Sequence, residues 1–159
     1  FNKTNIKIIN SSNQIKNLDF VISIGGNDLF SKKIEDLKRL KLNNECIKKC
    51  IKYNKQYLGI CYGAQILFKY FKGNLVKSNL HVKKKHNIIF KKRKYKVNSF
   101  HNYVIKKISK NFIPLAISQI DGSIEYFKHK KYNFFGVMWH PERDKESLNN
   151  SLKILRENQ

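Results

Sequence analysis

The residue whose surroundings most clearly indicate chemistry is Cys61, in the segment Gly59-Ile60-Cys61-Tyr62-Gly63. Its flanking glycines, two positions away on each side, match the nucleophile elbow, a sharp strand-to-helix turn that lifts a nucleophile above a sheet. The dipole of the following helix would favour the thiolate, and the backbone N–H of Tyr62 would help to hold an oxyanion. A buried structural cysteine in a strand–turn–helix connection is the alternative interpretation.

A cysteine nucleophile needs a base, and the base needs an orienting group. His140 ends an apolar run in Trp139-His140-Pro141-Glu142. Because Pro141 biases His140 toward extended backbone, His140 and Glu142 are expected to point the same way. Active sites of α/β proteins gather at strand ends, which favours a Cys61, His140 and Glu142 site over a strand-end histidine beside a surface glutamate.

A second oxyanion donor is expected at Gly25-Gly26, which follows another apolar run. Glycine allows close backbone approach at this position, and its N–H can face a reacting carbonyl. A plain tight turn, leading to a helix capped by Asn27 or Asp28, is the alternative.

The elements that must position these residues alternate between strand and helix. Apolar runs predict strands at Ile6–Asn10, Asp19–Ile24, Tyr57–Cys61 and Tyr132–His140, and periodic stretches predict helices at 43–53, 64–71 and 145–156. This order predicts an α/β fold with a doubly wound, mostly parallel sheet of the flavodoxin-like type. The short runs NLVKS, HNIIF, YKVNSF and FIPLAIS predict a short antiparallel hairpin extension. Residues 1–159 fit a single domain, with Phe134, Phe135 and Trp139 in its core.

The net charge of +22 comes almost entirely from lysines, since only four arginines occur. The lysines are scattered, so an AT-rich coding bias explains them better than a specific nucleic-acid site. An anionic substrate, such as a nucleotide conjugate, would still benefit from the positive field. The lysine-rich runs 83–85 and 91–94 are expected on solvated hairpin faces, and His129 is expected to be solvated among its lysine neighbours.

No apolar run approaches the roughly 20 residues that span a bilayer, and no secretory signal is visible. The odd count of three cysteines argues against a disulfide framework and favours a reducing cytoplasm. Cys46 and Cys50, four residues apart on a predicted helix, could bind a metal together with His81 and His86. Core positions are favoured for both cysteines, so no metal and no cofactor is expected.

Taken together, these segments resemble the class I glutamine amidotransferase superfamily. The matching stretches are VISIGGNDL, YLGICYGAQ, VNSFHN, DGSIEYF and FGVMWHPER, in family order between Val21 and Arg143. The resemblance implies that Cys61 is the nucleophile, His140 the general base and acid, and Glu142 the orienting carboxylate. It also implies an oxyanion hole made by the backbone N–H groups of Gly26 and Tyr62. The stretches that resemble γ-glutamyl-binding elements contain Gln65, Asn98, Ser99, Phe100 and His101.

Within the superfamily, GGND, the His81-Val82…His86 spacing and WHPER look closest to γ-glutamyl hydrolases. The resemblance therefore implies a cysteine-dependent hydrolase that cleaves the γ-glutamyl amide of glutamine or a conjugate and releases glutamate. The alternative is a glutaminase subunit that passes ammonia to a synthase partner. A third hypothesis, a basic binding module with a decayed site, is disfavoured because Cys61, His140 and Glu142 are intact. A homo-oligomer is also compatible with the sequence.

The sequence departs from the family at its start. The family normally opens with a strand and a helix before the region matched by IKIIN, and neither is visible here. The only methionine is Met138, so an N-terminally truncated chain is expected.

Overall fold

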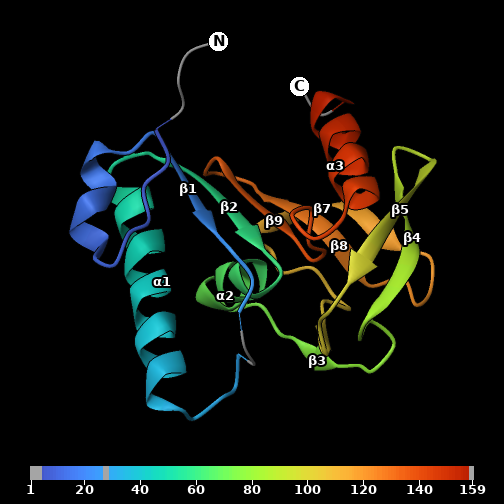
Figure 1. The fold of residues 1–159 in the computed structure, drawn as a ribbon, viewed down its shortest axis with the longest axis horizontal. Coiled ribbons are helices and arrows are strands. Elements are labelled where there is room, and N and C mark those ends of the chain that lie inside the picture. The colour runs from blue at the N-terminus through green and yellow to red at the C-terminus, as the bar shows by residue number, and fades with distance from the viewer. Residues whose placement is uncertain (1–4, 27–28, 158–159) are drawn as a thin grey trace.

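Three parallel strands carry the candidate site. In the computed structural model, which describes residues 5–26 and 29–157, β1 (Phe20–Ser23) pairs with β2 (Gln56–Ile60), and β2 pairs with β9 (Phe134–Val137). The carboxyl ends of parallel strands meet at one edge of a sheet. Figure 1 shows β1 beside β2 in the sheet. Gly25-Gly26 after β1, Cys61 after β2 and His140 after β9 therefore leave the sheet at the same edge.

An antiparallel region extends the sheet beyond β9. The complete strand order is β1-β2-β9-β8-β7-β4-β5. The added strands are β8 (Ile124–His129), β7 (Phe112–Ser118), β4 (Lys84–Phe90) and β5 (Arg93–Ser99), and all of their pairings are antiparallel. A separate small sheet joins β3 (Val76–Lys77) to β6 (Tyr103–Val104). The α/β fold is confirmed, but the sheet is mixed rather than mostly parallel. Two of its six strand pairings in the described residues are parallel, and the antiparallel region is larger than the short extension expected.

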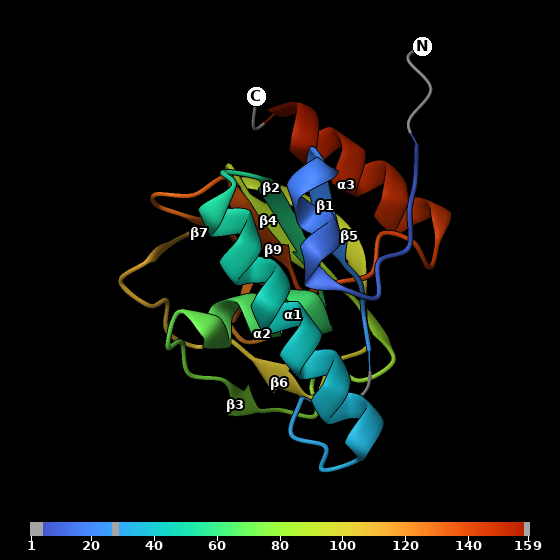
Figure 2. The same ribbon diagram turned by 90° about the vertical axis from the view of Figure 1, so that its left-hand side faces the viewer.

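Helices cover both faces of the sheet, as a doubly wound fold requires. Helices α1 (Ile34–Lys52) and α2 (Tyr62–Tyr70) lie on one side, and α3 (Lys145–Glu157) lies on the other (Figures 1 and 2). A 3₁₀ helix, η1 (Ser12–Asn17), packs against α1. Because the strands are pleated, neighbouring residues face opposite helices.

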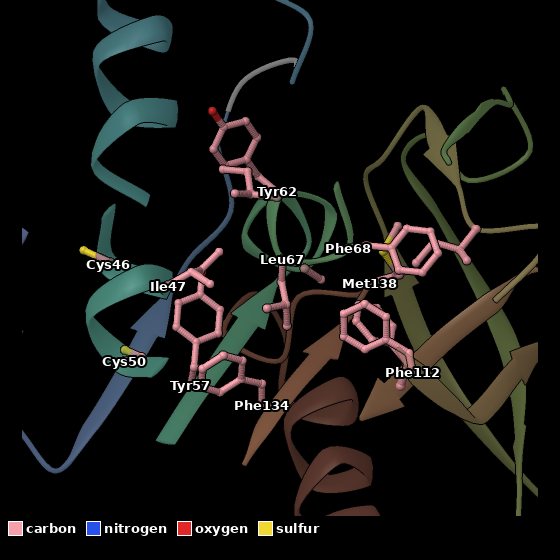
Figure 3. Close-up of a cluster of buried hydrophobic side chains, with 14 of the residues drawn as sticks. Cys46, Ile47, Cys50, Tyr57, Tyr62, Leu67, Phe68, Phe112, Phe134 and Met138 are labelled. Atoms are coloured by element: carbon pink, nitrogen blue, oxygen red, sulfur yellow. The ribbon is translucent and has the colours of Figure 1, made fainter. Parts of the chain in front are cut away.

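The two faces accordingly enclose two hydrophobic clusters. Tyr57 and Phe134 pack with Ile47 of α1 on one face (Figure 3). Leu58 and Phe135, the next residue on each strand, pack in the cluster that contains Trp139 and α3 Ile154. Phe134 and Trp139 are buried as expected, and Phe135 is half-buried.

Several predicted elements differ from the structure. Ile6–Asn10 is not a strand, and Ile6 and Ile8 are almost fully exposed because no strand lies beside them among the described residues. Helix α1 begins nine residues earlier than predicted. Its first turns carry exposed Ile34 and Leu37, which gave no clear apolar stripe. Strand β9 is shorter than Tyr132–His140, so the chain leaves the sheet before His140.

Strand β8 was not predicted as a strand. Its residues, IEYFKH, do not alternate between apolar and polar types, yet five of the six are buried. The Asp121-Gly122 pair before it was the available signal, since such pairs mark tight turns and Gly122 has a φ of +69°.

His129, at the end of β8, is buried, so the prediction of a solvated side chain was wrong. Its Nδ1 accepts the backbone N–H groups of Lys131 and Tyr132, and its ring lies 4.3 Å from that of Phe71. The neighbouring lysines suggested a solvated face, but the turn after β8 folds back over the ring.

The lysine-rich segments lie on the surface. The lysine-rich runs 83–85 and 91–94 are exposed on the β4–β5 hairpin and at its start, as expected. Among residues 5–26 and 29–157, no helix is both long enough and apolar enough to cross a bilayer.

We predict that Gly63→Ala destabilises the fold much more than Gly122→Ala. A Cβ at Gly63 would lie 2.1 Å from the backbone oxygen of Ser23, whereas a Cβ at Gly122 meets nothing within 4 Å. Gly122→Ala should cost only the positive-φ strain of about 1–2 kcal/mol. Gly63→Ala should lower the free energy of unfolding by roughly 3 kcal/mol or more, measured by urea denaturation. Equal losses would mean that β1 and α2 are not packed this tightly.

Candidate active site

The turn at Cys61 has the strained geometry of a nucleophile elbow. Cys61 has φ 49° and ψ −101°, a conformation that non-glycine residues rarely adopt, and it caps the N-terminus of α2. Its backbone N–H donates to the oxygen of Val137, 2.8 Å away, which ties the turn to the end of β9. A Cβ at Gly59 would lie 2.5 Å from the backbone of Gly63 and Ala64, so small residues are required around the cysteine.

The Gly25-Gly26 loop passes close to both His140 and Tyr62. A Cβ at Gly25 would lie 2.5 Å from Cε1 of His140, and one at Gly26 would lie 3.1 Å from Cδ1 of Tyr62. The glycines thus permit the close backbone approach that the sequence suggested. The proposed capping residues of the alternative interpretation, Asn27 and Asp28, lie outside the described residues.

Arg39 of α1 holds this loop in place, a role that the sequence analysis missed. Its Nη2 donates to the backbone oxygens of Gly25, at 2.5 Å, and of Ile24, at 3.4 Å. Its guanidinium also lies over the ring of Tyr62, 5.1 Å from the centroid. The only sequence signal was that Arg39 is one of four arginines in a lysine-rich chain.

His140 is buried and is oriented from two directions. Its Nδ1 lies 2.6 Å from Oε1 of Glu142, whose side chain is 47% exposed. If Nδ1–H donates to this carboxylate, the neutral ring keeps its lone pair on Nε2. The side chain of Asn98 accepts the backbone N–H of His140 at 2.8 Å and donates to its backbone oxygen at 2.7 Å.

Burial favours the neutral forms of both Cys61 and His140. It raises the pKa of the Cys61 thiol to about 12, an effect that the Tyr62 N–H opposes and the negative charge of Glu125 reinforces. Burial also lowers the pKa of His140 from 6.5, although the contact with Glu142 works in the other direction. Both shifts favour a thiol and a neutral imidazole in the free site. The expected stabilisation of a thiolate by the helix N-terminus is outweighed by desolvation.

The residues expected to bind the γ-glutamyl group have different surroundings. Gln65 is buried in the first turn of α2. Phe100 is 39% exposed, contacts the His140 ring edge-to-face at 5.6 Å, and lies under the guanidinium of Arg143 at 4.3 Å. Substrate contact stays a prediction for both residues.

Asn98, Ser99 and His101 are buried and are engaged inside the protein. The amide group of Asn98 donates to His140 and to Asp144, so it positions the histidine backbone. The hydroxyl of Ser99 donates to the oxygen of His81 at 2.6 Å. Nδ1 of His101 lies 2.9 Å from the oxygen of Tyr103. All three side chains form hydrogen bonds to backbone atoms inside the protein and do not face solvent.

Cys46 and Cys50 lie in the core between α1 and the sheet, as the favoured interpretation expected (Figure 3). All three described cysteines are free thiols. Burial raises the pKa of Cys46 to about 11 and that of Cys50 to about 12.

Known proteins are similar to this chain over most of its length. A family model described as "Glutamine amidotransferase class-I" matches residues 2–154. The chain belongs to this family. It is 40% identical over 139 residues to a gamma-glutamyl-CDP-amidate hydrolase of Campylobacter jejuni, covering 86% of this chain and 68% of that protein. It is 30% identical over 151 residues to a glutamine-hydrolyzing GMP synthase subunit of Methanococcus vannielii, covering 89% of this chain and 71% of that protein.

Solved structures share the fold of this amidotransferase domain. A glutamine amidotransferase from Thermotoga maritima superposes with a TM-score of 0.65 at 14% identity, covering 88% of this chain and 63% of that one. A Thermoplasma acidophilum structure, provisionally described as a GMP synthase subunit, gives a TM-score of 0.70 at 22% identity, covering 94% and 78%.

We predict that iodoacetamide alkylates Cys61 slowly at neutral pH. The thiolate is the reactive form, and a pKa of about 12 leaves only about one part in 10⁴ as thiolate at pH 8. The alkylation rate at Cys61, followed by peptide mass spectrometry, should rise about tenfold per pH unit between pH 7 and 10. Fast alkylation that is independent of pH above 6 would instead reveal a thiolate–imidazolium pair.

Proposed function

We propose that this protein is a cysteine-dependent hydrolase that cleaves a γ-glutamyl amide bond and releases glutamate. The observation that carries the proposal is the strained turn at Cys61, which leaves the same sheet edge as the His140–Glu142 pair. Membership of the amidotransferase family and the 40% identity to a γ-glutamyl amidate hydrolase support the same reaction class.

In the acylation step, the sulfur of Cys61 attacks the γ-carbonyl carbon of the substrate. The thiol proton passes to Nε2 of His140, which is neutral before the attack because burial lowers its pKa. The N–H groups of Gly26 and Tyr62 would stabilise the oxyanion of the tetrahedral intermediate. His140 then gives its proton to the leaving nitrogen, the C–N bond breaks, and a γ-glutamyl thioester forms on Cys61.

In the deacylation step, His140 accepts a proton from a water molecule that attacks the thioester carbonyl. The C–S bond breaks, the proton returns to the sulfur, and glutamate leaves. Glu142 keeps Nδ1 protonated and stabilises the transient imidazolium in both steps.

For the leaving group we propose an anionic conjugate rather than ammonia. The Campylobacter relative is named for a CDP-amidate substrate, and this chain carries a net charge of +22. Exposed Arg143, seated over Phe100 beside His140, offers a cation at the site. A positive field raises the local concentration of an anionic substrate and speeds its association.

The alternative function is that of a glutaminase subunit which delivers ammonia to a synthase partner. The 30% identity to a GMP synthase subunit, over 89% of this chain, favours it. In that case, substrate turnover would depend on a second protein.

We predict that His140→Ala and Cys61→Ala each lower kcat/KM by on the order of 10⁴-fold or more, because these residues move protons and carry the acyl group. Glu142→Gln should cost less and leave measurable activity, because a carboxylate that only orients the base is partly replaceable, whereas the base moves protons at two steps. Glu146→Gln, a nearby exposed carboxylate paired with Lys85, is the matched control and should have little effect. Equal, small effects of the His140 and Glu142 changes would show that the triad is misassigned.

We predict that the purified protein hydrolyses γ-glutamyl conjugates without any partner. Glutamate release should be measured with glutamine, neutral γ-glutamyl amines and γ-glutamyl-CDP-amidate. The anionic conjugate should have the highest kcat/KM, because remote binding energy lowers the barrier, and its advantage should shrink at high salt. If all conjugates are inert, and glutamine is cleaved only after a synthase is added, the glutaminase-subunit function replaces this one.

A further inference from the structure

A buried cluster of three histidines and one glutamate lies beside the candidate active site. His81 precedes β4, His86 lies within β4, His101 follows β5, and Glu125 lies in β8. All four side chains are buried, with Glu125 and His81 fully removed from solvent. The ring of His81 stacks on that of His101 at 4.8 Å and meets that of His86 edge-on at 4.9 Å.

The carboxylate at the centre of this cluster has no conventional hydrogen bond. Among the described residues, neither oxygen of Glu125 has a hydrogen-bond partner. Instead, three ring nitrogens surround its Oε1: Nδ1 of His81 at 3.4 Å, Nε2 of His101 at 3.6 Å and Nε2 of His86 at 3.8 Å. These separations exceed the usual length of an N–H···O bond, and a buried carboxylate left in this state is costly.

The outer hydrogen bonds indicate which ring nitrogens carry protons. Nδ1 of His101 faces the carbonyl oxygen of Tyr103 at 2.9 Å and must donate to it. Nε2 of His81 lies 3.3 Å from Oδ1 of Asp121, which also favours an N–H there. In the neutral rings of His81 and His101, the nitrogens that face Glu125 are then bare lone pairs. These nitrogen lone pairs and the Glu125 carboxylate are all electron-rich and face one another. A cation between them would remove their mutual repulsion.

We propose that this cluster is a binding site for one zinc ion, held by His81, His86, His101 and Glu125. Ligand bonds of about 2.0–2.1 Å place the donor atoms of a tetrahedral site about 3.3–3.4 Å apart, close to the separations around Oε1. One ligand atom from each of His81, His86 and Glu125 already lies within 4.8 Å of the other two. His101 lies outside this group, although its Nε2 is 3.6 Å from Oε1 of Glu125, so its ring would have to move inward to complete the site. Three imidazoles and one carboxylate suit zinc rather than magnesium or calcium, which prefer all-oxygen sites.

The outer contacts match those of a built metal site. Asp121 behind His81 and the Tyr103 carbonyl behind His101 are the kind of partners that fix a ligand's ring orientation. The backbone of His81 is itself held, since its oxygen accepts the Ser99 hydroxyl and the N–H of His101.

A site closed by four protein ligands, with no solvent access, has a structural role. The ion would join the loop before β4, the exit of β5 and the start of β8. The β5 exit includes Phe100, which packs on His140, so loss of the ion should also loosen that side of the active site. The alternative is that protons replace the metal and the histidines form an imidazolium–carboxylate network.

The test is the metal content of the purified wild-type protein, measured by mass spectrometry of the elements after dialysis against zinc-free buffer. We expect about one zinc per chain. Removal by a strong chelator should lower the thermal unfolding midpoint, and added zinc should restore it. Substitution by Co²⁺ should give the intense visible bands of a tetrahedral site without the near-ultraviolet thiolate band that cysteine ligands would add.

Glu125→Gln and His86→Asn should lose the zinc, whereas Cys46→Ala/Cys50→Ala, the control for other candidate ligands, should keep it. If a ligand variant fails to fold, the zinc content of the wild-type protein and its Co²⁺ spectrum still test the proposal. A metal-free wild-type protein whose unfolding midpoint does not respond to zinc overturns the proposal in favour of the protonated network. Loss of zinc in the cysteine variant would place the metal elsewhere and equally overturn it.

Discussion

The site depends on one backbone constraint, the left-handed conformation of Cys61 between β2 and α2. A non-glycine residue stays in this conformation only when its surroundings enforce it. Here β2 is held between β1 and β9, while α2 packs so closely on β1 that no side chain fits at Gly63. The same three strands deliver the Gly25-Gly26 loop and His140 to the sheet edge, so the sheet that strains the turn also assembles the site.

The second determinant is the exclusion of water from the reacting groups. Desolvation raises the pKa of Cys61 and lowers that of His140, so in the proposed mechanism charge develops on both only as the reaction proceeds. In the proposed mechanism, backbone N–H donors and Glu142 would stabilise the charge that develops during the reaction. Nearby charges also act on the thiol, since Arg143 lowers its pKa and Glu142 raises it.

Local signals made the elbow, the His-Pro-Glu segment and the three parallel strands predictable, because each depends on glycine spacing, proline or a continuous apolar run. Features that depend on tertiary packing were not predictable. Three examples are the burial of His129, the hydrogen bond from Arg39 to Gly25 and the first half of α1. Each depends on neighbours that are distant in the sequence. The buried histidines were visible as residues, but only the strand order β8-β7-β4-β5 brings them to Glu125. Sequence spacing had associated His81 and His86 with cysteines that the fold places in the core.

The central claim is that Cys61, alone among the three cysteines, reacts with a γ-glutamyl carbonyl. The most direct measurement is inactivation by a glutamine-like diazoketone, followed by peptide mass spectrometry of the modified protein. We expect one adduct per chain on the peptide that contains Cys61. Its formation should be slowed by added γ-glutamyl substrate and should be absent after His140→Ala. An adduct on Cys46 or Cys50, or full inactivation with Cys61 unmodified, would contradict it.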